Sequence, residues 1–278
     1  MKNNGNRDMK QTESAPSAAL GRNEMRRSYD AYFASGLYVS RYPKPNRRCL
    51  RLLSAALPKG GRLLDYGAGE GRYCFALAKS HDADVLAVDI SAVARSHLSS
   101  AAQSEGLGAK VTVCDVGDAA YTREVESGSY DVALLGFGVL GHIAGRSRRL
   151  EALIDMRRAL KPAGTLVLGV PNAFRRMREQ QAECRPMVER GELEPGDIRY
   201  RRSVGGNDIA LFYHLFTETE IRDDLTAAGF TVERLTGESL LPESAVTHSS
   251  LVGILDDLAC AVVPPGLCYG LLIAARPR

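Results

Sequence analysis

An acidic residue followed by alternate glycines marks the part of this chain best suited to bind a ligand. Asp65 ends a short apolar run and is followed by Gly67, Gly69 and Gly71. Glycine permits backbone conformations closed to other residues and lets a ligand approach the main chain closely. A helix that begins at about Gly71 directs its free amide groups toward the same turn. The pattern of strand, tight turn and helix therefore predicts a loop that holds a nucleotide-like molecule.

Two more acidic residues follow the next apolar runs. Asp89 ends the second run and Asp115 the third, and the carboxyl ends of parallel strands meet at one crevice where ligands bind. Asp89 is placed to accept hydrogen bonds from both hydroxyls of a ribose. Three carboxylates repel a pyrophosphate, and the G-x-G-x-G spacing departs from the dinucleotide pattern. A ligand with an ammonium group, ribose hydroxyls and an adenine amine fits better, so a dehydrogenase is the weaker alternative.

Short apolar runs alternate with helical patterns from residue 62 onward. The expected strands are 62–66, 85–90, 111–116, 132–136 and 165–170, and the expected helices are 71–80, 91–105, 118–126 and 146–160. Nearly continuous apolar runs are typical of strands covered on both faces, so the alternation predicts a parallel sheet with right-handed crossovers. The stretch 171–213 breaks this regularity. A last unit follows, with helices near 218–228 and 250–262 and strands near 230–236 and 268–274. Ser91 and either Thr217 or Thr219 are the expected helix caps.

Together these motifs resemble those of the class I S-adenosylmethionine-dependent methyltransferases. The resemblance spans about residues 60–172 and the last helix and strand pair. It is carried by Asp65-Tyr-Gly-Ala-Gly-Glu-Gly71, Asp89, Asp115-Val116, Tyr130-Asp-Val-Ala-Leu-Leu-Gly-Phe-Gly-Val-Leu-Gly-His142 and Leu160-Lys-Pro-Ala-Gly. It implies an α/β fold, namely a Rossmann-like, mostly parallel seven-stranded sheet with helices on both faces, plus an N-terminal lid segment and two insertions. It also implies S-adenosyl-L-methionine as the cofactor.

The resemblance assigns positions around that cofactor as well. Its methionine part would lie beside Asp65, Gly67, Ala68, Gly69 and Gly71, and its ribose on Asp89. The adenine would contact Ile90, Asp115 and Val116, with Gly136 and Phe137 closing the pocket. The aromatic segment 29–42 would fold over the cofactor as a lid, with Arg41 or Tyr38 meeting its carboxylate. An extra helix packed on the sheet is the alternative for this segment.

Three residues are candidates for the catalytic step. His142 follows the fourth strand, and the ordinary histidine pKa of about 6.5 suits a base at neutral pH; the alternative is a histidine that only pins its loop. Tyr213 and His214 would line the acceptor pocket, unless they belong to a hydrophobic staple that fixes the next helix. A sulfonium methyl group is already activated, so alignment is the main task. A base is required only when the acceptor must lose a proton.

The chain is expected to have three parts: a disordered tail at 1–22, a helical or lid segment at 23–58 and the methyltransferase domain at 59–278. Insertions near 171–213 and 238–266 would form the pocket of a small molecule methylated at an oxygen, a nitrogen or a carboxylate. The strings at 196–200 and 212–220 are loosely similar to wobble-uridine tRNA methyltransferases, so tRNA is an alternative acceptor. An inactive cofactor-binding module is a further alternative.

Composition limits these alternatives. The net charge of +3 and the pI of about 8.5 are low for a large RNA footprint. Arginines crowd 175–202 among acidic residues, which predicts a solvated, ion-paired face, with an anion-binding or RNA-facing surface as the alternative.

The six cysteines form no C-x-x-C pair, so we expect buried free thiols, no metal and a cytoplasmic protein. Pro264, Pro265 and Gly266 break the apolar run 258–275, so no membrane span is expected. No oligomeric state is indicated.

Overall fold

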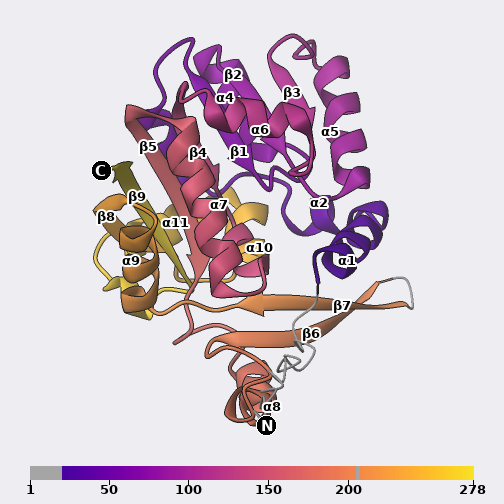
Figure 1. Cartoon of the computed structure of the whole chain (residues 1–278), viewed down its shortest axis with the longest axis vertical. Coiled ribbons are helices and arrows are strands. Elements are labelled where there is room, and N and C mark those ends of the chain that lie inside the picture. The colour runs from indigo at the N-terminus through magenta and orange to yellow at the C-terminus, as the bar shows by residue number, and fades with distance from the viewer. Residues whose placement is uncertain (1–20, 205–206) are drawn as a thin grey trace, which may run out of the picture.

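In the computed structural model, which describes residues 21–204 and 207–278, seven strands form the central sheet (Figure 1). Their order is β3 (Val111–Cys114), β2 (Asp84–Val88), β1 (Arg62–Tyr66), β4 (Tyr130–Leu135), β5 (Leu160–Pro171), β9 (Gly270–Pro277) and β8 (Phe230–Ser239). Strands β1 to β5 are parallel to their neighbours, and β9 runs antiparallel between β5 and β8. The predicted Rossmann-like, mostly parallel seven-stranded sheet is thus confirmed. Its strand order reverses between β1 and β4, and such a switch point opens a crevice at the carboxyl ends of the strands.

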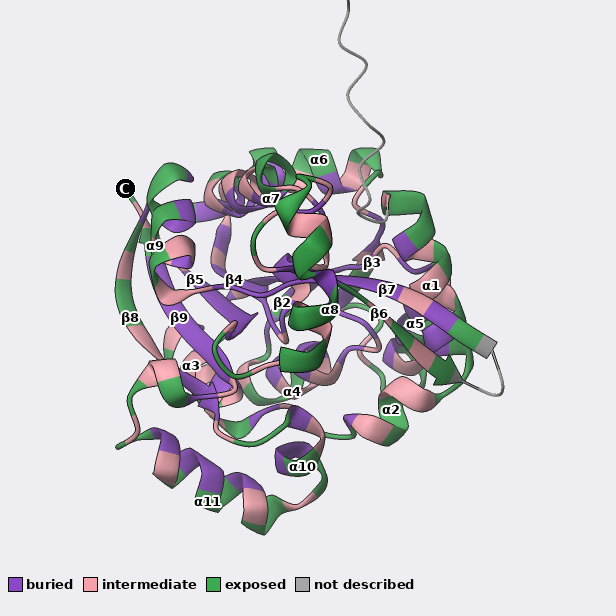
Figure 2. Cartoon of the chain, turned by 90° about the horizontal axis from the view of Figure 1, so that it is seen from below, coloured by how far each residue is buried: buried purple, intermediate pink, exposed green. Residues whose placement is uncertain are grey.

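Helices cover both faces of this sheet (Figure 2). One face carries α3 (Arg47–Ala56), α4 (Arg72–His81) and α5 (Ala92–Ser104), and the other carries α6 (Ala119–Glu126), α7 (Arg146–Ala159) and α9 (Glu218–Ala227). Each layer buries its own apolar core, with Leu53 and Leu77 on the first face and Leu153 on the second. The expected caps form, because the hydroxyl oxygens of Ser91 and Thr217 each accept a hydrogen bond from an amide of the first helical turn.

Two N-terminal helices lie beyond the carboxyl ends of the strands. The first, α1 (Arg22–Ala34), contacts α5 and β7, and α2 (Leu37–Arg41) follows it. Residues 1–20 of the predicted tail lie outside the described residues, whereas Arg22 already belongs to α1. The packing of α1 across this edge places its side chains over the crevice.

The insertion at 171–213 is more regular than its sequence suggested. It contains α8 (Arg178–Glu189) and an antiparallel hairpin of β6 (Asp197–Val204) and β7 (Asn207–His214), which lies below the main sheet in Figure 1. The prediction of an irregular segment was wrong because arginines hide the alternation of β6. Ile198 is buried and Arg199 and Arg201 are exposed, as expected of a strand with one covered face.

The C-terminal run folds as the sequence predicted. The helices α10 (Glu243–His248) and α11 (Ser250–Cys260) precede a short turn, η2 (Pro265–Leu267), and then β9 enters the sheet. No helix within the described ranges is both long and apolar enough to cross a membrane. All six cysteines are buried and unpaired, which confirms the expectation of free thiols.

Candidate active site

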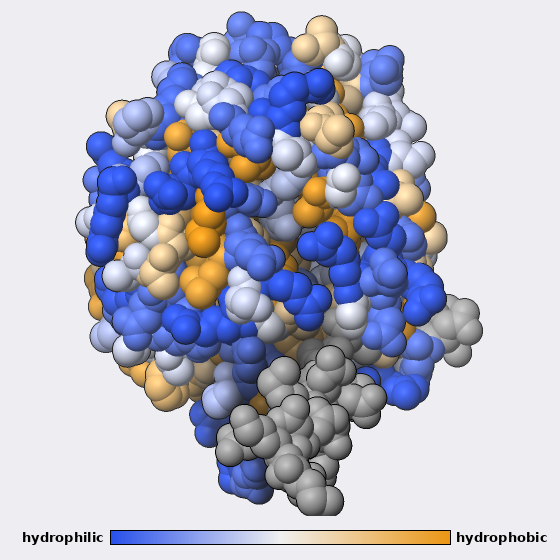
Figure 3. Space-filling view, in the orientation of Figure 1, coloured by the Kyte–Doolittle hydropathy of each residue, from blue (hydrophilic) through white to orange (hydrophobic). Residues whose placement is uncertain are grey.

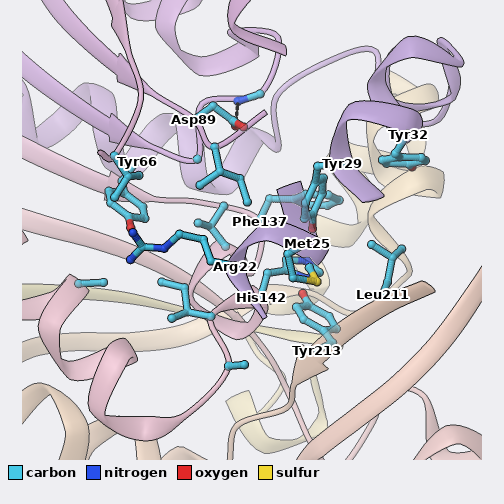
Figure 4. A pocket seen from close by; sticks show the side chains of 18 of the residues that line it. Arg22, Met25, Tyr29, Tyr32, Tyr66, Asp89, Phe137, His142, Leu211 and Tyr213 are labelled. Carbon is cyan, nitrogen blue, oxygen red and sulfur yellow. Dashed lines mark hydrogen bonds between the residues drawn. The ribbon is translucent and has the colours of Figure 1, made fainter. Parts of the chain in front are cut away.

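A cavity of about 230 Å³ lies at the carboxyl ends of the strands. Its walls come from the N-terminal helices, from the segments that follow strands β1 to β5, from α7 and from the hairpin β6–β7. In the space-filling view, hydrophobic residues show between hydrophilic ones near the middle of the visible surface (Figure 3). Figure 4 shows Asp89 at one end of the cavity and Tyr213 at the other, with Met25, Tyr29 and His142 between them.

The glycine loop follows β1 and forms one wall of the cavity. Gly67 has a φ of 83°, and a Cβ atom at this position would overlap the side chain of Val139 in η1 (Val139–His142). This position therefore requires glycine. Gly67 and Gly69 line the cavity, and α4 begins at Arg72 directly after the loop, as predicted.

Asp89 is the predicted carboxylate that faces the cavity. Its Oδ2 accepts a hydrogen bond from the amide of Gly69 at 2.9 Å, and its Oδ1 accepts one from the amide of Ser91 at 2.8 Å. Each oxygen keeps a lone pair that a ribose hydroxyl can use. Burial raises the pKa of Asp89 to about 6, against the effect of these two amides. The apolar side chains of Ile90 and Val116 line the wall beside it, so this end of the cavity fits an adenosine.

The other two predicted carboxylates are engaged inside the protein. Asp65 is buried and accepts a hydrogen bond from Sγ of Cys74 at 3.1 Å, and burial raises its pKa to about 6. Asp115 pairs with Arg26 of α1 at 2.7 Å and with Arg95 at 3.2 Å. Neither carboxylate lines the cavity. The acceptor predicted for the adenine amine is thus occupied by two guanidinium groups.

Of the other residues predicted to contact the cofactor, some line the cavity and some do not. Phe137 lines the cavity, with its ring centroid 4.5 Å from that of Tyr42 and 4.4 Å from the guanidinium carbon of Arg72. Its φ of 56° is uncommon for a bulky residue and is often found near functional sites. The predicted positions that do not line the cavity are Ala68, Gly71, Gly136 and Arg41.

His142 lies in the cavity wall between two tyrosines. Its Nδ1 is 2.9 Å from the carbonyl oxygen of Phe212, and because a carbonyl only accepts, Nδ1 carries the proton and Nε2 keeps its lone pair. The ring stacks on Tyr213 with 4.2 Å between centroids and meets the edge of Tyr29 at 5.3 Å. Burial lowers the pKa of His142 to about 3, and nearby arginines act in the same direction. The ordinary histidine pKa of about 6.5, on which the prediction of a catalytic base rested, therefore does not hold for His142. At neutral pH His142 is a neutral hydrogen-bond acceptor.

Tyr213 closes the far end of the cavity. Its hydroxyl accepts a hydrogen bond from Nη1 of Arg176 at 3.3 Å. Gly138, with a φ of 74°, makes room for it, because a Cβ atom there would overlap the hydroxyl. Burial raises the pKa of Tyr213 well above its usual range, so the hydroxyl keeps its proton for donation to a ligand.

His214 does not reach the cavity, and its prediction as a catalytic residue is corrected by this geometry. Neighbouring side chains of a strand point to opposite faces, so His214 faces away when Tyr213 faces inward. Its Nδ1 lies 2.6 Å from Oδ1 of Asp197 and its Nε2 lies 2.8 Å from Oε1 of Glu220.

Glu194, Asp197 and His214 lie close together and are residue types that can bind a metal ion. One carboxylate oxygen or ring nitrogen from each lies within 4.8 Å of the others. Hydrogen bonds within the group and to Arg149 already satisfy them.

The sequence did not identify Arg176, Tyr200 and Arg202 as cavity residues. All three line the wall, although the range 175–202 was predicted to be a solvated, ion-paired face. Arg199 and Arg201 are exposed, as that prediction requires, whereas Arg176 and Arg202 line the cavity and contradict it. The alternation of Tyr200 and Arg202 with exposed residues in β6 is the signal that could have identified two of them.

Comparison with known families gives one clear match. Residues 38–235 match the model of a family described as a methyltransferase domain. The matched range contains the glycine loop, Asp89, His142 and Tyr213. No match was found among the curated proteins.

Solved structures of similar fold include three informative neighbours. A Methanosarcina mazei S-adenosylmethionine-dependent methyltransferase is 21% identical, with a TM-score of 0.61, and the match covers 81% of this chain and 96% of the neighbour. The cyclase SpnF is 17% identical, with a TM-score of 0.60 and coverages of 93% and 97%. The 1,6-didemethyltoxoflavin-N1-methyltransferase of Burkholderia thailandensis, solved with 1,6-didemethyltoxoflavin and S-adenosylhomocysteine, is 19% identical, with a TM-score of 0.54 and coverages of 95% and 92%. These likenesses establish the fold, which alone does not fix the reaction.

Proposed function

Given that this chain belongs to the methyltransferase-domain family and is a class I S-adenosylmethionine-dependent enzyme, we propose that it methylates a small molecule. The methylated atom is an oxygen, a nitrogen or a carboxylate oxygen. The single observation that carries the proposal is the cavity itself, because it joins a carboxylate suited to a ribose with a histidine and a tyrosine suited to an acceptor. A neighbour of the same fold was solved with a small molecule and S-adenosylhomocysteine bound, which supports a small-molecule acceptor.

The residues at the Asp89 end would hold the cofactor. Asp89 would accept hydrogen bonds from the ribose hydroxyls, Ile90 and Val116 would contact the adenine, and the main chain at Gly67 and Gly69 would approach the methionine part. When bound, the sulfonium supplies a methyl group that is already activated for transfer. Holding the reacting atoms in line accounts for a large part of the rate enhancement expected of such a site.

The residues at the Tyr213 end would hold the acceptor. Nε2 of His142 accepts a hydrogen bond from the hydroxyl or amine to be methylated, and the Tyr213 hydroxyl donates one. The rings of Tyr29 and Phe137 cover the space between them and exclude water. Because His142 is held neutral, it positions the acceptor and does not remove a proton in a separate step.

Transfer to tRNA is the alternative that this geometry supports less well. Residues of the N-terminal helices line the cavity, and so do Arg176 and Arg202. A wobble base would have to enter beneath α1, which the ion pair of Arg26 with Asp115 holds in place. A small acceptor requires no such opening.

Labelled S-adenosylmethionine tests the proposal directly. The purified protein is incubated with it and a cell extract, and label is expected in the small-molecule fraction. Label in the RNA fraction would favour the tRNA alternative. Cofactor binding without label in either fraction would favour an inactive module.

The Asp89→Ala variant tests the placement of the ribose. We expect binding of S-adenosylhomocysteine to weaken by about 1–3 kcal/mol, the scale of a lost hydrogen bond to a charged group, as measured by calorimetry. Asp84→Ala is the matched control, because Asp84 lies at the exposed start of the same strand. Equal affinities for the two variants would overturn the ribose assignment.

A further inference from the structure

Two guanidinium groups line the Tyr213 end of the cavity without a carboxylate partner. In the part of the chain that the structure describes, no acidic oxygen lies within 4.0 Å of a guanidinium nitrogen of Arg176 or Arg202. Arg176 hydrogen-bonds the hydroxyl of Tyr213 at 3.3 Å, and its buried Nε has no hydrogen-bond partner. Arg202 donates to the hydroxyl of Tyr32 at 2.7 Å. A charge withdrawn from water is costly unless an opposite charge accompanies it, so these two groups indicate a place for an anion.

The two arginines act on one part of the cavity. Both lower the pKa of His142, after the larger effect of burial, and both oppose the rise in the pKa of Tyr200. Arg176 hydrogen-bonds the hydroxyl of Tyr213, whose ring stacks on His142 with 4.2 Å between centroids. The guanidinium carbon of Arg202 lies 5.9 Å from the ring centroid of Tyr200. Both guanidinium groups therefore border the part of the cavity that His142, Tyr200 and Tyr213 line.

No acidic residue of the cavity neutralises this pair. The acidic residues that line the cavity are Asp89, Glu151 and Asp155, and among the described residues none lies within 4.0 Å of a guanidinium nitrogen of Arg176 or Arg202. Asp89 lies at the opposite end of the cavity (Figure 4). Glu238 is the carboxylate that most affects Arg176, but it does not line the cavity and lies more than 4.0 Å away. Burial and the neighbouring Glu243 raise the pKa of Glu238, which favours its neutral form.

Aromatic rings surround the two guanidinium groups. The guanidinium carbon of Arg202 lies 5.1 Å from the ring centroid of Tyr32 and 5.9 Å from that of Tyr200. The guanidinium carbon of Arg176 lies 5.3 Å from the ring centroid of Tyr213. Ring faces and edges of this kind favour a flat, apolar ligand body.

We propose that the acceptor is an aromatic acid whose carboxylate binds between Arg176 and Arg202. The inference rests on the proposed methyl transfer and names its substrate class. The planar guanidinium groups match the geometry of a carboxylate, and the tyrosines contact the ring. A ring hydroxyl or amine then lies at Nε2 of His142. In the transfer the carbon–sulfur bond breaks with its electron pair on sulfur, and the methyl carbon bonds to that oxygen or nitrogen while its proton shifts along the hydrogen bond to Nε2 of His142. The proton leaves to water when the product is released.

Binding to matched acids and amides tests this inference. The full chain is saturated with S-adenosylhomocysteine and titrated with hydroxybenzoates, aminobenzoates and quinoline carboxylates, each paired with its primary amide. At least one carboxylate is expected to bind tenfold or more tightly than its amide, the scale of a charge-assisted hydrogen bond. Carboxylates that bind no better than their amides would overturn the inference.

Two variants assign the effect to the arginines. Arg176→Gln and Arg202→Gln are expected to lower carboxylate affinity about tenfold or more and to leave S-adenosylhomocysteine affinity unchanged. Arg201→Gln, at an exposed position beside Arg202 in β6, is the matched control and is expected to bind as the wild type does. A loss of cofactor affinity in the Arg176 and Arg202 variants would assign these residues to the cofactor and overturn the inference. Absence of cofactor binding in the wild type would instead contradict the proposed function.

Discussion

At the scale of single residues, the site separates two kinds of charged group. Asp89 is a buried carboxylate held by two backbone amides at one end, whereas Arg176 and Arg202 are cations without carboxylate partners at the other. His142 lies between them and remains neutral because burial and the two cations disfavour its charged form. This arrangement gives the two ends different ligand preferences within one cavity.

The pKa of Asp89 leads to a pH-dependent cofactor affinity. Burial raises this pKa to about 6, so the carboxylate form that accepts from both ribose hydroxyls is complete above that pH and is lost as the pH falls through it. We expect the affinity for S-adenosylhomocysteine to fall about tenfold between pH 7.5 and pH 5, as measured by calorimetry.

The Asp89→Asn variant is the control for this pH effect. Its affinity should be lower at pH 7.5 and should change much less with pH, because an amide does not titrate. Asp65 also has a pKa of about 6 but does not line the cavity. An equal pH slope in the wild type and in Asp89→Asn would assign the titration to another group.

At the scale of elements, α1 is fastened to the domain at several points. Arg26 pairs with Asp115 after β3, Asp30 accepts a hydrogen bond from Ser91 at the start of α5, and Ser28 donates one to the carbonyl of Ala210 in β7. These contacts hold the helix across the cavity. A helix that must move to admit a ligand would have to break them.

Removing the Arg26 side chain should loosen α1. We expect Arg26→Gln to speed hydrogen exchange at the amides of α1, while those of α3 exchange as in the wild type. Arg27→Gln is the matched control, because Arg27 is the next residue in the same helix and is exposed. If the two variants exchange alike, the ion pair with Asp115 does not hold the helix.

Local patterns predicted the elements better than the contacts between them. The sequence identified the strands of the parallel sheet, the glycine loop, Asp89 and the caps Ser91 and Thr217, because each depends on neighbouring residues. It missed the partner of Asp115, because Arg26 lies 89 positions away. It also missed the hairpin, since the arginines of β6 mask a two-residue period that only the packed structure reveals.

At the scale of the whole molecule, a buried network fastens the hairpin insertion to the methyltransferase core. His214 of β7 lies between Asp197 of β6 and Glu220 of α9. Arg149 of α7 is fully buried and pairs with Glu194 of the insertion at 2.8 Å. The network thus joins the acceptor end of the cavity to two helices of the core, so its integrity positions Tyr213 relative to Asp89.

Replacing His214 should therefore destabilise the protein in a pH-dependent way. Burial lowers the pKa of His214, but its hydrogen bonds to Asp197 and Glu220 outweigh this effect and raise the pKa above the ordinary value. The stabilisation by the charged ring is therefore complete below the unfolded pKa of about 6.5 and is lost as the pH rises through the folded pKa. We expect His214→Gln to lower the free energy of unfolding by about 3–5 kcal/mol at pH 6, the scale for a broken buried ion pair.

The difference in the free energy of unfolding between the wild type and His214→Gln should become smaller between pH 6 and pH 9, because the stabilisation by the charged ring falls as the pH rises toward the folded pKa and the variant has no such group. Urea denaturation of both proteins at pH 6 and pH 9 measures it. His248→Gln, at an exposed position, is the control and should match the wild type at both pH values. If the difference in the free energy of unfolding stays constant or grows toward pH 9, the ring of His214 is neutral in the folded protein. Packing, and not this charge, would then hold the hairpin to the core.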